Sequence, residues 1–294
     1  MAKRSDYILG GVIVLSLLLF LVIVTYMFWT VASRGGLALA PSGNRVALIE
    51  LLGPINASEN IVRQLKKYKE NDSIPAIVLR INSPGGSVAS TQEMYREIKR
   101  VRAVGKKVVV SMASVAASGG YYVACAADTI VANPGTLTGS IGVILEFPNT
   151  EELFKKIGIR FEVVKSGKYK DIGSPMRKMT KEERKLLQEL IDDTYNQFVD
   201  VVAADRGLDR QAVLDLADGR VFTGRQGQDY GLIDVLGDYE EAIALAAEMA
   251  GIEGKPKTVR EWRKRITLWD LLLQKLGGTG HQSYLMPSLE YRFQ

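Results

Sequence analysis

The chain has 294 residues, of which 47% are hydrophobic, and a formal net charge of +5. That charge is too small and too dispersed to indicate a nucleic-acid-binding protein. The single histidine, His281, and the single cysteine, Cys125, exclude a histidine-rich zinc site and an intramolecular disulfide. A Ser-His-Asp triad would have to recruit His281 from a Gly-rich tail, so lysine is the most available base for nucleophilic catalysis. Cys125 lies in the apolar run YYVACAA and is expected to be an inert core thiol.

Residues 7–33 contain no charged side chain. As a helix, the apolar core from Ile8 to Trp29 would be about 33 Å long, which is enough to cross a bilayer. The sequence predicts an uncleaved signal anchor, because cleaved signal peptides have apolar cores of only about 7–15 residues. Lys3 and Arg4 precede the span, which favours a cytoplasmic N-terminus at 1–6 and an exported body. The expected location is the cell membrane, with a single pass and the body on the extracytoplasmic side.

A linker at 34–44 leads into a body that alternates short apolar strands with helices. Strands are expected at 45–51, 76–82, 108–110, 129–132, 138–144, 161–165 and 232–235. Helices are expected at 58–70, 88–102, 121–127, 149–157, 180–206, 209–217, 224–231 and 238–251. This alternation is typical of a parallel α/β fold. No G-x-G-x-x-G motif follows a strand and no Walker A loop is present, so no nucleotide or other cofactor is expected.

Three loops that follow apolar strands carry reactive or anion-binding chemistry. SPGG at 83–86 offers backbone N–H groups without side-chain obstruction, as an oxyanion hole requires, although ordinary turns share this composition. In ASGG, Ser118 lies at or near a helix N-terminus, where it fits either an N-cap or a nucleophile. SGKYKD at 166–171 brings Lys168 and Lys170 to a strand exit. Two solvated surface lysines are the alternative there, and the residues alone do not choose between them as a base.

Taken together, these loops resemble the bacterial signal peptide peptidase family, which are membrane-anchored Ser-Lys proteases related to Clp proteases and crotonases. The resemblance covers about residues 44–252. It rests on motifs that occur in the family's order and approximate spacing: SPGG, ASGGYY, TGSIGV at 138–143, SGKYKDIGSP at 166–175, and DGRVFTG with YGLID at 218–234. It implies a Clp/crotonase-like β-β-α superhelix at 45–254, preceded by one transmembrane helix and followed by a basic segment and tail at 255–294. Gly227 departs from the family pattern, where many relatives have alanine.

The resemblance also assigns roles residue by residue. Ser118 looks like the nucleophile and Lys170 like the general base. Ser140 looks like the hydroxyl that orients the lysine amine. The backbone N–H groups of Gly86 and Gly119 look like the oxyanion hole. No metal or cofactor takes part in this scheme.

The proposed lysine base sets a condition on its surroundings. Only a neutral amine can accept the Ser118 proton, so the lysine pKa must fall from about 10.4 toward about 7–8, as burial can achieve. An ion pair between Lys170 and the neighbouring Asp171 would raise that pKa and oppose this role. We therefore expect the Asp171 carboxylate to point away from Lys170.

The function that the resemblance implies is a serine endopeptidase acting on extended, apolar peptides, such as signal peptides left in the membrane after secretion. It also implies that the peptide binds as an added strand and that the chain forms a ring-shaped homo-oligomer. Two alternatives stay open. A crotonase-like acyl-CoA enzyme shares the oxyanion hole but needs neither a membrane anchor nor a Ser-Lys pair. A non-catalytic membrane scaffold would bind partner proteins through the basic patch at 255–265 (KPKTVREWRKR).

The tail from Gly277 to Gln294 ends in the extended stretch SYLMPSLEYRF. A disordered terminus is the simplest interpretation of this stretch. The sharper hypothesis is that the tail docks in the active-site groove as a self-ligand. Deleting the chain from Gly277 would then change the rate on short peptides.

Overall fold

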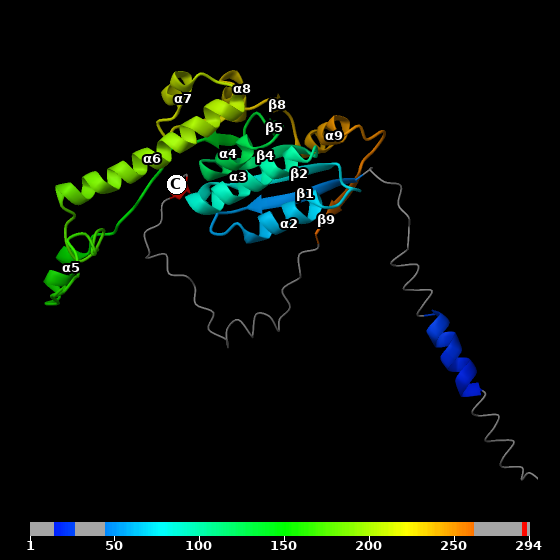
Figure 1. Cartoon of the computed structure of the whole chain (residues 1–294), viewed down its shortest axis with the longest axis horizontal. Helices are drawn as coiled ribbons and strands as arrows, with labels where there is room; N and C mark the ends of the chain where they lie inside the picture. The colour runs from blue at the N-terminus through cyan, green and yellow to red at the C-terminus, as the bar shows by residue number, and fades with distance from the viewer. Residues whose placement is uncertain (1–14, 27–44, 262–289, 293–294) are drawn as a thin grey trace, which may run out of the picture. The chain divides into compact units, whose positions relative to one another are not determined.

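The structure is a computed structural model that describes residues 15–26, 45–261 and 290–292. The chain divides into two compact units, Met1–Ser42 and Gly43–Gln294, and each is considered by itself. The second unit contains the central sheet and every candidate site residue (Figure 1).

In the first unit, residues 15–26 form a helix. Its apolar side chains are exposed, for example Phe20 at 66%. Within the described residues, no helix combines the length and the apolar character needed to cross a membrane. The rest of the anchor predicted at 7–33 lies outside the described residues.

A mostly parallel sheet forms the centre of the second unit. Its strands are β1 (Arg45–Leu52), β2 (Ala76–Ser83), β4 (Lys107–Ala117), β5 (Thr129–Ala132), β6 (Leu137–Gly139), β7 (Val221–Thr223), β8 (Val235–Leu236) and β9 (Lys257–Arg260). The order is β7-β6-β4-β2-β1-β9, and β5 pairs with both β4 and β8. Among these pairs only β6 and β7 are antiparallel. A separate antiparallel pair joins β3 (Gly85–Ser87) to β10 (Glu290–Arg292).

Helices cover both faces of the sheet. They are α2 (Glu59–Lys69), α3 (Val88–Ala103), α4 (Gly119–Cys125), α5 (Glu151–Lys156), α6 (Lys181–Arg206), α7 (Arg210–Leu216), α8 (Gly224–Asp229) and α9 (Tyr239–Met249). Side chains alternate along a strand, so Ala47 and Ile49 of β1 pack in one core with α2, α3, α4 and α6, whereas Val46 and Leu48 pack with α9. Burial on both faces explains why the strands are apolar runs rather than alternating ones.

The long strand β4 sets the position of the candidate site. Its first half pairs with β5 as far as Met112, and its last residues pair with β6 from Val115 onward. On its other side it pairs with β2 up to Ser83. Because these strands are parallel, the loops that follow β2, β4 and β6 lie at the same edge of the sheet, where ligands bind in such folds.

The short helix α4 is entirely buried. Its Tyr121 hydroxyl donates a 3.0 Å hydrogen bond to the Leu232 carbonyl. The ring of Tyr122 makes an edge-to-face contact with Phe198 of α6 at a centroid distance of 5.1 Å. Cys125 is 1% exposed, and burial raises the pKa of its thiol to about 12. The expectation of an inert core thiol is confirmed.

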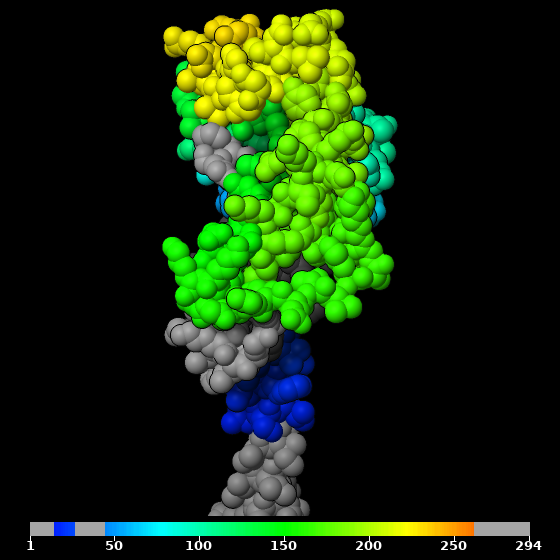
Figure 2. Space-filling model, turned by 90° about the vertical axis from the view of Figure 1, so that its left-hand side faces the viewer, coloured from blue at the N-terminus to red at the C-terminus, as the bar shows by residue number. Residues whose placement is uncertain are grey.

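Helix α6 extends beyond the sheet, and α5 lies at its far end (Figure 1). Residues 145–190, which include α5 and the first part of α6, form what we call the arm. Figure 2 shows the arm at the end of α6 that is farther from α7. Glu183 is the only buried residue in the arm. Large apolar side chains there are exposed: Leu153, Ile157, Ile159, Phe161, Val163, Val164, Leu186 and Leu190.

Some predicted elements differ from the structure. The strand expected at 161–165 is wrong, because this stretch pairs with no strand in the described part of the chain and every residue from 155 to 170 is exposed. The strand expected at 138–144 ends at Gly139, because Ser140 has a φ of 49° that does not fit a strand. The sheet also reaches past residue 254, since β9 pairs in parallel with β1. The helix expected at 180–206 is confirmed as α6.

Candidate active site

Ser118 lies in the turn between β4 and α4. Its backbone has φ 51° and ψ −118°, a conformation that costs a non-glycine residue about 1–3 kcal/mol. The turn is fixed by its backbone, because the Ser118 N–H donates to the Gly139 carbonyl at 2.8 Å and the Ser118 carbonyl accepts from the Tyr122 N–H at 2.9 Å. Ser118 occupies the N-cap position of α4, yet its side chain makes no capping hydrogen bond. The capping interpretation of this serine is therefore wrong.

The Ser118 hydroxyl is buried and has no hydrogen-bond partner within the described residues. The residue is 1% exposed, and its Oγ makes no hydrogen bond with any described residue. An unpaired buried hydroxyl costs roughly 1–3 kcal/mol. A strained backbone and an unsatisfied polar atom in the same residue are typical of functional sites.

Ser140 follows the strand next to Ser118. The register of β4 and β6 pairs Ala117 with Gly139, so Ser118 and Ser140 are the next residues on the two adjoining strands. The Ser140 N–H donates to the Arg220 carbonyl at 2.8 Å. Among the described residues, Ser118 and Ser140 alone are non-glycine residues with positive φ. The structure thus brings together the two serines that the sequence singled out.

The glycine loops also meet at this edge. A Cβ placed on Gly120 would lie 2.9 Å from the Ser83 carbonyl oxygen, so the start of α4 packs directly against the end of β2. A Cβ on Gly86 would lie 2.3 Å from the Ile55 carbonyl oxygen, and Gly86 has a φ of 153°. Only glycine fits such an approach between two backbones. Gly119, the first residue of α4, has a backbone N–H without a partner inside the helix.

Strand β3 is paired on both of its edges. On one edge the Ile55 N–H donates to the Gly85 carbonyl at 2.8 Å, and the Ser87 N–H donates to the Ile55 carbonyl at 2.7 Å. On the other edge β10 pairs with β3, and Tyr291 lies opposite Gly86. Because backbone groups alternate in direction along a strand, the Gly86 N–H faces β10. Strand β10 also contacts α4, the helix that follows Ser118.

Lys170 is not part of this assembly within one chain. It lies in the exposed stretch of the arm. Since the Ser118 Oγ has no hydrogen-bond partner among the described residues, the Lys170 amine is not bonded to it. Lys168 forms an ion pair with Glu182, and the hydrogen bond that its amine donates to that carboxylate raises the Lys168 pKa. A lysine held in its protonated form is a poor base, which favours Lys170 over Lys168.

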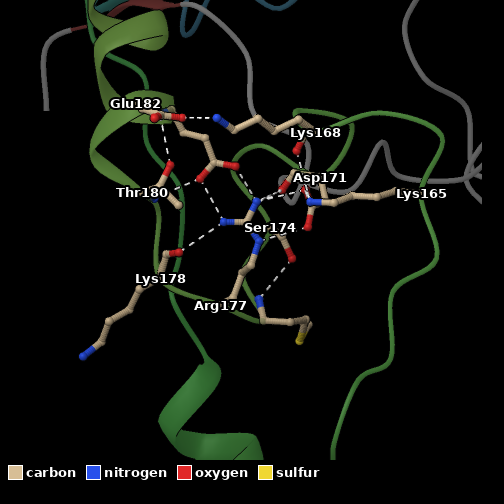
Figure 3. Close-up of polar contacts among 10 residues, drawn as sticks. Lys165, Lys168, Asp171, Ser174, Arg177, Lys178, Thr180 and Glu182 are labelled. Atoms are coloured by element: carbon tan, nitrogen blue, oxygen red, sulfur yellow. Dashed lines mark hydrogen bonds and ion pairs between the residues drawn. The ribbon is translucent and has the colours of Figure 1, made fainter.

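Asp171 points away from Lys170, as expected from the sequence. Its carboxylate accepts hydrogen bonds from Arg177 and from Lys165 (Figure 3). These bonds, that from Arg177 foremost, hold the pKa of Asp171 well below its usual range. Arg177 also bonds Glu183, and this hydrogen bond is the main cause that lowers the Glu183 pKa to about 2.

Sequence reasoning missed Arg177. It offered docking of the tail in the active-site groove as a hypothesis but did not identify β3 as the partner of residues 290–292. Arg177 lies six residues from both Asp171 and Glu183, so a single arginine between two equally spaced carboxylates was the available signal. The pairing of β10 with Gly85–Ser87 could be proposed from the extended pattern of the tail, but the position of this strand depends on the fold.

Known proteins resemble this chain over most of its second unit. The family model for Clp protease matches residues 44–135, and that for Peptidase family S49 matches residues 100–253. A putative protease of Synechocystis is 46% identical over 71% of this chain and 76% of that protein. A putative protease of Methanocaldococcus jannaschii is 37% identical over 71% of this chain and 72% of its own length. A putative signal peptide peptidase SppA of Enterococcus faecium is 39% identical over 63% of this chain and 54% of that protein.

The two family models match different, overlapping parts of the chain. The Clp protease match covers β1 to β5, and with it the loops after β2 and β4. This supports the Clp-like α/β fold predicted from the sequence. The S49 match covers Ser118, Ser140 and the arm, and it extends over more than half of the chain. The chain therefore belongs to peptidase family S49 and is a serine protease.

Proposed function

We propose that this protein is a membrane-anchored endopeptidase in which Ser118 is the nucleophile and Lys170 is the general base. Its substrates are extended, apolar peptides, such as the remnants of signal peptides after secretion. The observation that carries the proposal is the Ser118 hydroxyl, which is buried, unpartnered and held on a strained turn beside two glycine loops.

The reaction follows from these groups. The neutral lysine amine accepts the Ser118 proton while Oγ attacks the peptide carbonyl carbon. The Gly86 and Gly119 N–H groups stabilise the oxyanion, and such donors contribute about 10²–10³ in kcat each. The lysine then gives its proton to the leaving amine. A water then loses a proton to the lysine and attacks the acyl-enzyme, and the lysine returns that proton to the departing Ser118 Oγ as the acid product is released. Ser140 orients the amine throughout.

A neighbouring subunit supplies the lysine in this proposal. Within one chain Lys170 lies in an exposed arm, away from the buried surroundings that a lysine base needs. The arm also exposes a set of large apolar side chains, including Phe161 at 50% and Val163 at 55%. Contact with another copy would bury them, since exposed apolar patches mark interaction sites. A ring of copies, each arm reaching the next Ser118, would both bury the lysine and complete the site.

The mode of peptide binding is supported by the tail. Strand β3 accepts β10 as an antiparallel partner beside Gly86. A peptide that adds to the same edge would bind through backbone hydrogen bonds, largely independently of its sequence. Its scissile carbonyl would pass the Gly86 N–H. This geometry suits extended substrates.

The membrane anchor is placed at 7–33, with the N-terminus in the cytoplasm and the peptidase body on the extracytoplasmic side of the cell membrane. Support comes from the absence of charge over this stretch and from the exposed apolar helix at 15–26. An anchor holds the peptidase near the apolar peptides that it would cleave.

Mixing two inactive variants tests whether Ser118 and Lys170 form the catalytic dyad and whether the lysine comes from a neighbouring subunit. Ser118→Ala and Lys170→Ala should each abolish cleavage of a fluorogenic apolar peptide, whereas Lys168→Ala should retain activity. After subunit exchange between the two inactive variants, about a quarter of the sites would combine an intact serine with an intact neighbouring lysine. Full activity in Lys170→Ala would refute the dyad. Absence of recovery despite subunit exchange would show that the lysine comes from the same chain.

Covalent labelling separates this proposal from an acyl-CoA enzyme. A serine-reactive phosphonate should label Ser118, and Lys170→Ala should slow the labelling because the hydroxyl is no longer activated. A crotonase-like enzyme, which holds the oxyanion without a nucleophilic serine, would stay unlabelled.

A further inference from the structure

Arg177 connects the loop that carries Lys170 to the start of α6 (Figure 3). Its Nε and Nη2 atoms donate to the two Asp171 carboxylate oxygens, each at 2.9 Å. Its Nη1 donates to Glu183 Oε2 at 2.8 Å, and Nη2 also bonds Glu183. Both carboxylates are therefore held by two hydrogen bonds, a geometry that the planar guanidinium provides and an ammonium does not.

The Glu183 side of this connection is firmly fixed. Glu183 is 2% exposed and belongs to the 26-residue helix α6. Its Oε2 accepts the Thr180 N–H at 2.9 Å, while the Thr180 Oγ1 accepts the Glu183 N–H at 3.2 Å. This capping box ties the carboxylate to the first turn of the helix. Glu183 thus gives Arg177 a rigid point of attachment.

Hydrogen bonds from Arg177 and Lys165 hold the backbone before and after Lys170. Arg177 Nη2 also donates to the Asp171 carbonyl at 3.3 Å. On the other side, Lys165 Nζ donates to the Lys168 carbonyl at 3.1 Å and to the Asp171 carboxylate. The Lys170 N–H closes a turn onto the Gly167 carbonyl at 3.2 Å. The backbone of Lys170 is fixed, while its neighbouring carboxylate is engaged elsewhere.

Apolar packing on this loop is sparse in the single chain. Every residue from 155 to 170 is exposed, and Glu183 is the only buried residue of the arm. Much of the order in such a segment has to come from its polar contacts, and a segment with few buried contacts otherwise opens readily. Since a displacement of about 1 Å can cost 10²-fold in rate, a base on this loop needs such an attachment.

We propose that Arg177 is a positioning residue, which fixes Lys170 relative to α6 and keeps Asp171 from pairing with the lysine amine. This inference rests on the proposed function, in which Lys170 is the base. Arg177 itself touches neither substrate nor Ser118. Its effect is to present the amine in one place and to leave it free of a carboxylate.

The test compares Arg177→Ala with Arg184→Ala. Arg184 is an exposed residue in the first turn of α6, so its replacement removes the same charge from the same arm without touching the cluster. On a fluorogenic apolar peptide, Arg177→Ala should lower kcat by about 10²-fold and leave KM nearly unchanged. Arg184→Ala should keep wild-type kcat and KM. A merely structural role would lower only the amount of folded enzyme, which lowers the total rate at constant KM; kcat per Ser118 titrated with the serine-reactive phosphonate would then stay at the wild-type value.

Further variants test whether Arg177 acts through Asp171 and whether the planar guanidinium is required. Asp171→Asn should lower kcat less than Arg177→Ala, and the double variant should be no worse than Arg177→Ala, because both act through one contact. Arg177→Lys should restore only part of the rate, since an ammonium cannot hold both carboxylates in pairs of hydrogen bonds. If Arg177→Ala does not assemble, the kcat and KM of Asp171→Asn decide the question.

Two results would overturn the proposal, and they have different consequences for the Ser118–Lys170 dyad. Wild-type kcat in Arg177→Ala, together with an inactive Lys170→Ala, would refute the positioning role and leave the dyad intact. An active Lys170→Ala would refute the dyad and the positioning role together.

Discussion

The Ser118 N–H donates a 2.8 Å hydrogen bond to the Gly139 carbonyl, and this bond places two strained serines beside each other. Ser140, the next residue after Gly139, has a φ of 49°, and Ser118 has a φ of 51°. Both conformations occur where adjoining parallel strands end. The position of the nucleophile therefore depends on the register between β4 and β6, and a slip of one residue would exchange the side chains on the two faces.

The strain at Ser118 predicts a difference between two inactive variants. Ser118→Gly and Ser118→Ala should both lack peptidase activity, but the glycine variant should be more stable by about 1 kcal/mol. Glycine adopts a positive φ without a steric penalty, whereas alanine keeps the strain of the serine. Urea unfolding of the full chain measures the difference. Equal midpoints for the two variants would show that no strain is stored at this position.

The close approach at Gly86 predicts loss of both activity and stability. In Gly86→Ala the new Cβ would meet the Ile55 carbonyl oxygen at 2.3 Å, so β3 must move. We expect a destabilisation of about 1–3 kcal/mol and a fall in kcat of about 10²-fold as the N–H leaves its place. Gly135→Ala is the matched control, because nothing lies within 4 Å of its Cβ position. Comparable effects in both variants would argue against a specific role for Gly86.

The pairing of β10 with β3 predicts that the tail competes with substrate. Deletion from Gly277 should raise kcat/KM on short peptides, because the edge of β3 beside Gly86 becomes free. Tyr291→Pro should have the same effect, since proline lacks the N–H that a strand needs, whereas Tyr291→Ala keeps the backbone pairing. Peptidase assays of the three variants give the comparison. An unchanged rate after deletion would argue against docking in the groove.

The attachment of the arm should weaken in acid. The folded pKa of Glu183 is about 2, below the ordinary value of 4.5, chiefly because Arg177 donates to its carboxylate. A lowered pKa means that this contribution to stability is fully present above about pH 4.5 and is lost as the pH falls toward about 2. Hydrogen exchange of residues 165–178, corrected for intrinsic rates, should report opening in that interval.

Glu183→Gln provides the control for the acid prediction. The amide does not titrate, so the pH dependence of exchange in this segment should flatten and protection should be low already near neutral pH. An acid-induced opening of the same size in Glu183→Gln would assign the effect to other carboxylates.

The sequence predicted the glycine and serine loops well because their meeting follows from topology. SPGG, ASGG and Ser140 each follow a parallel strand, and the carboxyl ends of parallel strands share one edge of the sheet. The strand at 45–51 could also be predicted from the sequence, since its apolar run reflects burial on two faces.

The arm and the edge strands could not be predicted in this way. Residues 161–165 (FEVVK) have the composition of a strand, but they have no partner strand among the residues that the structure describes. Lys257–Arg260 form β9 despite their polar composition, because an edge strand beside β1 needs to bury little. The position of Lys170 depends on where the arm lies, and local propensity contains no information on that.

Cys125 makes the native chain a ready background for site-specific labelling. It is the only cysteine in the sequence, it is 1% exposed, and its thiol stays protonated because its pKa is about 12. Maleimide reagents attack exposed thiolates, so a single cysteine introduced on the arm would carry the dye alone, without prior replacement of Cys125. Energy transfer between dyes on neighbouring copies could then follow assembly as it occurs.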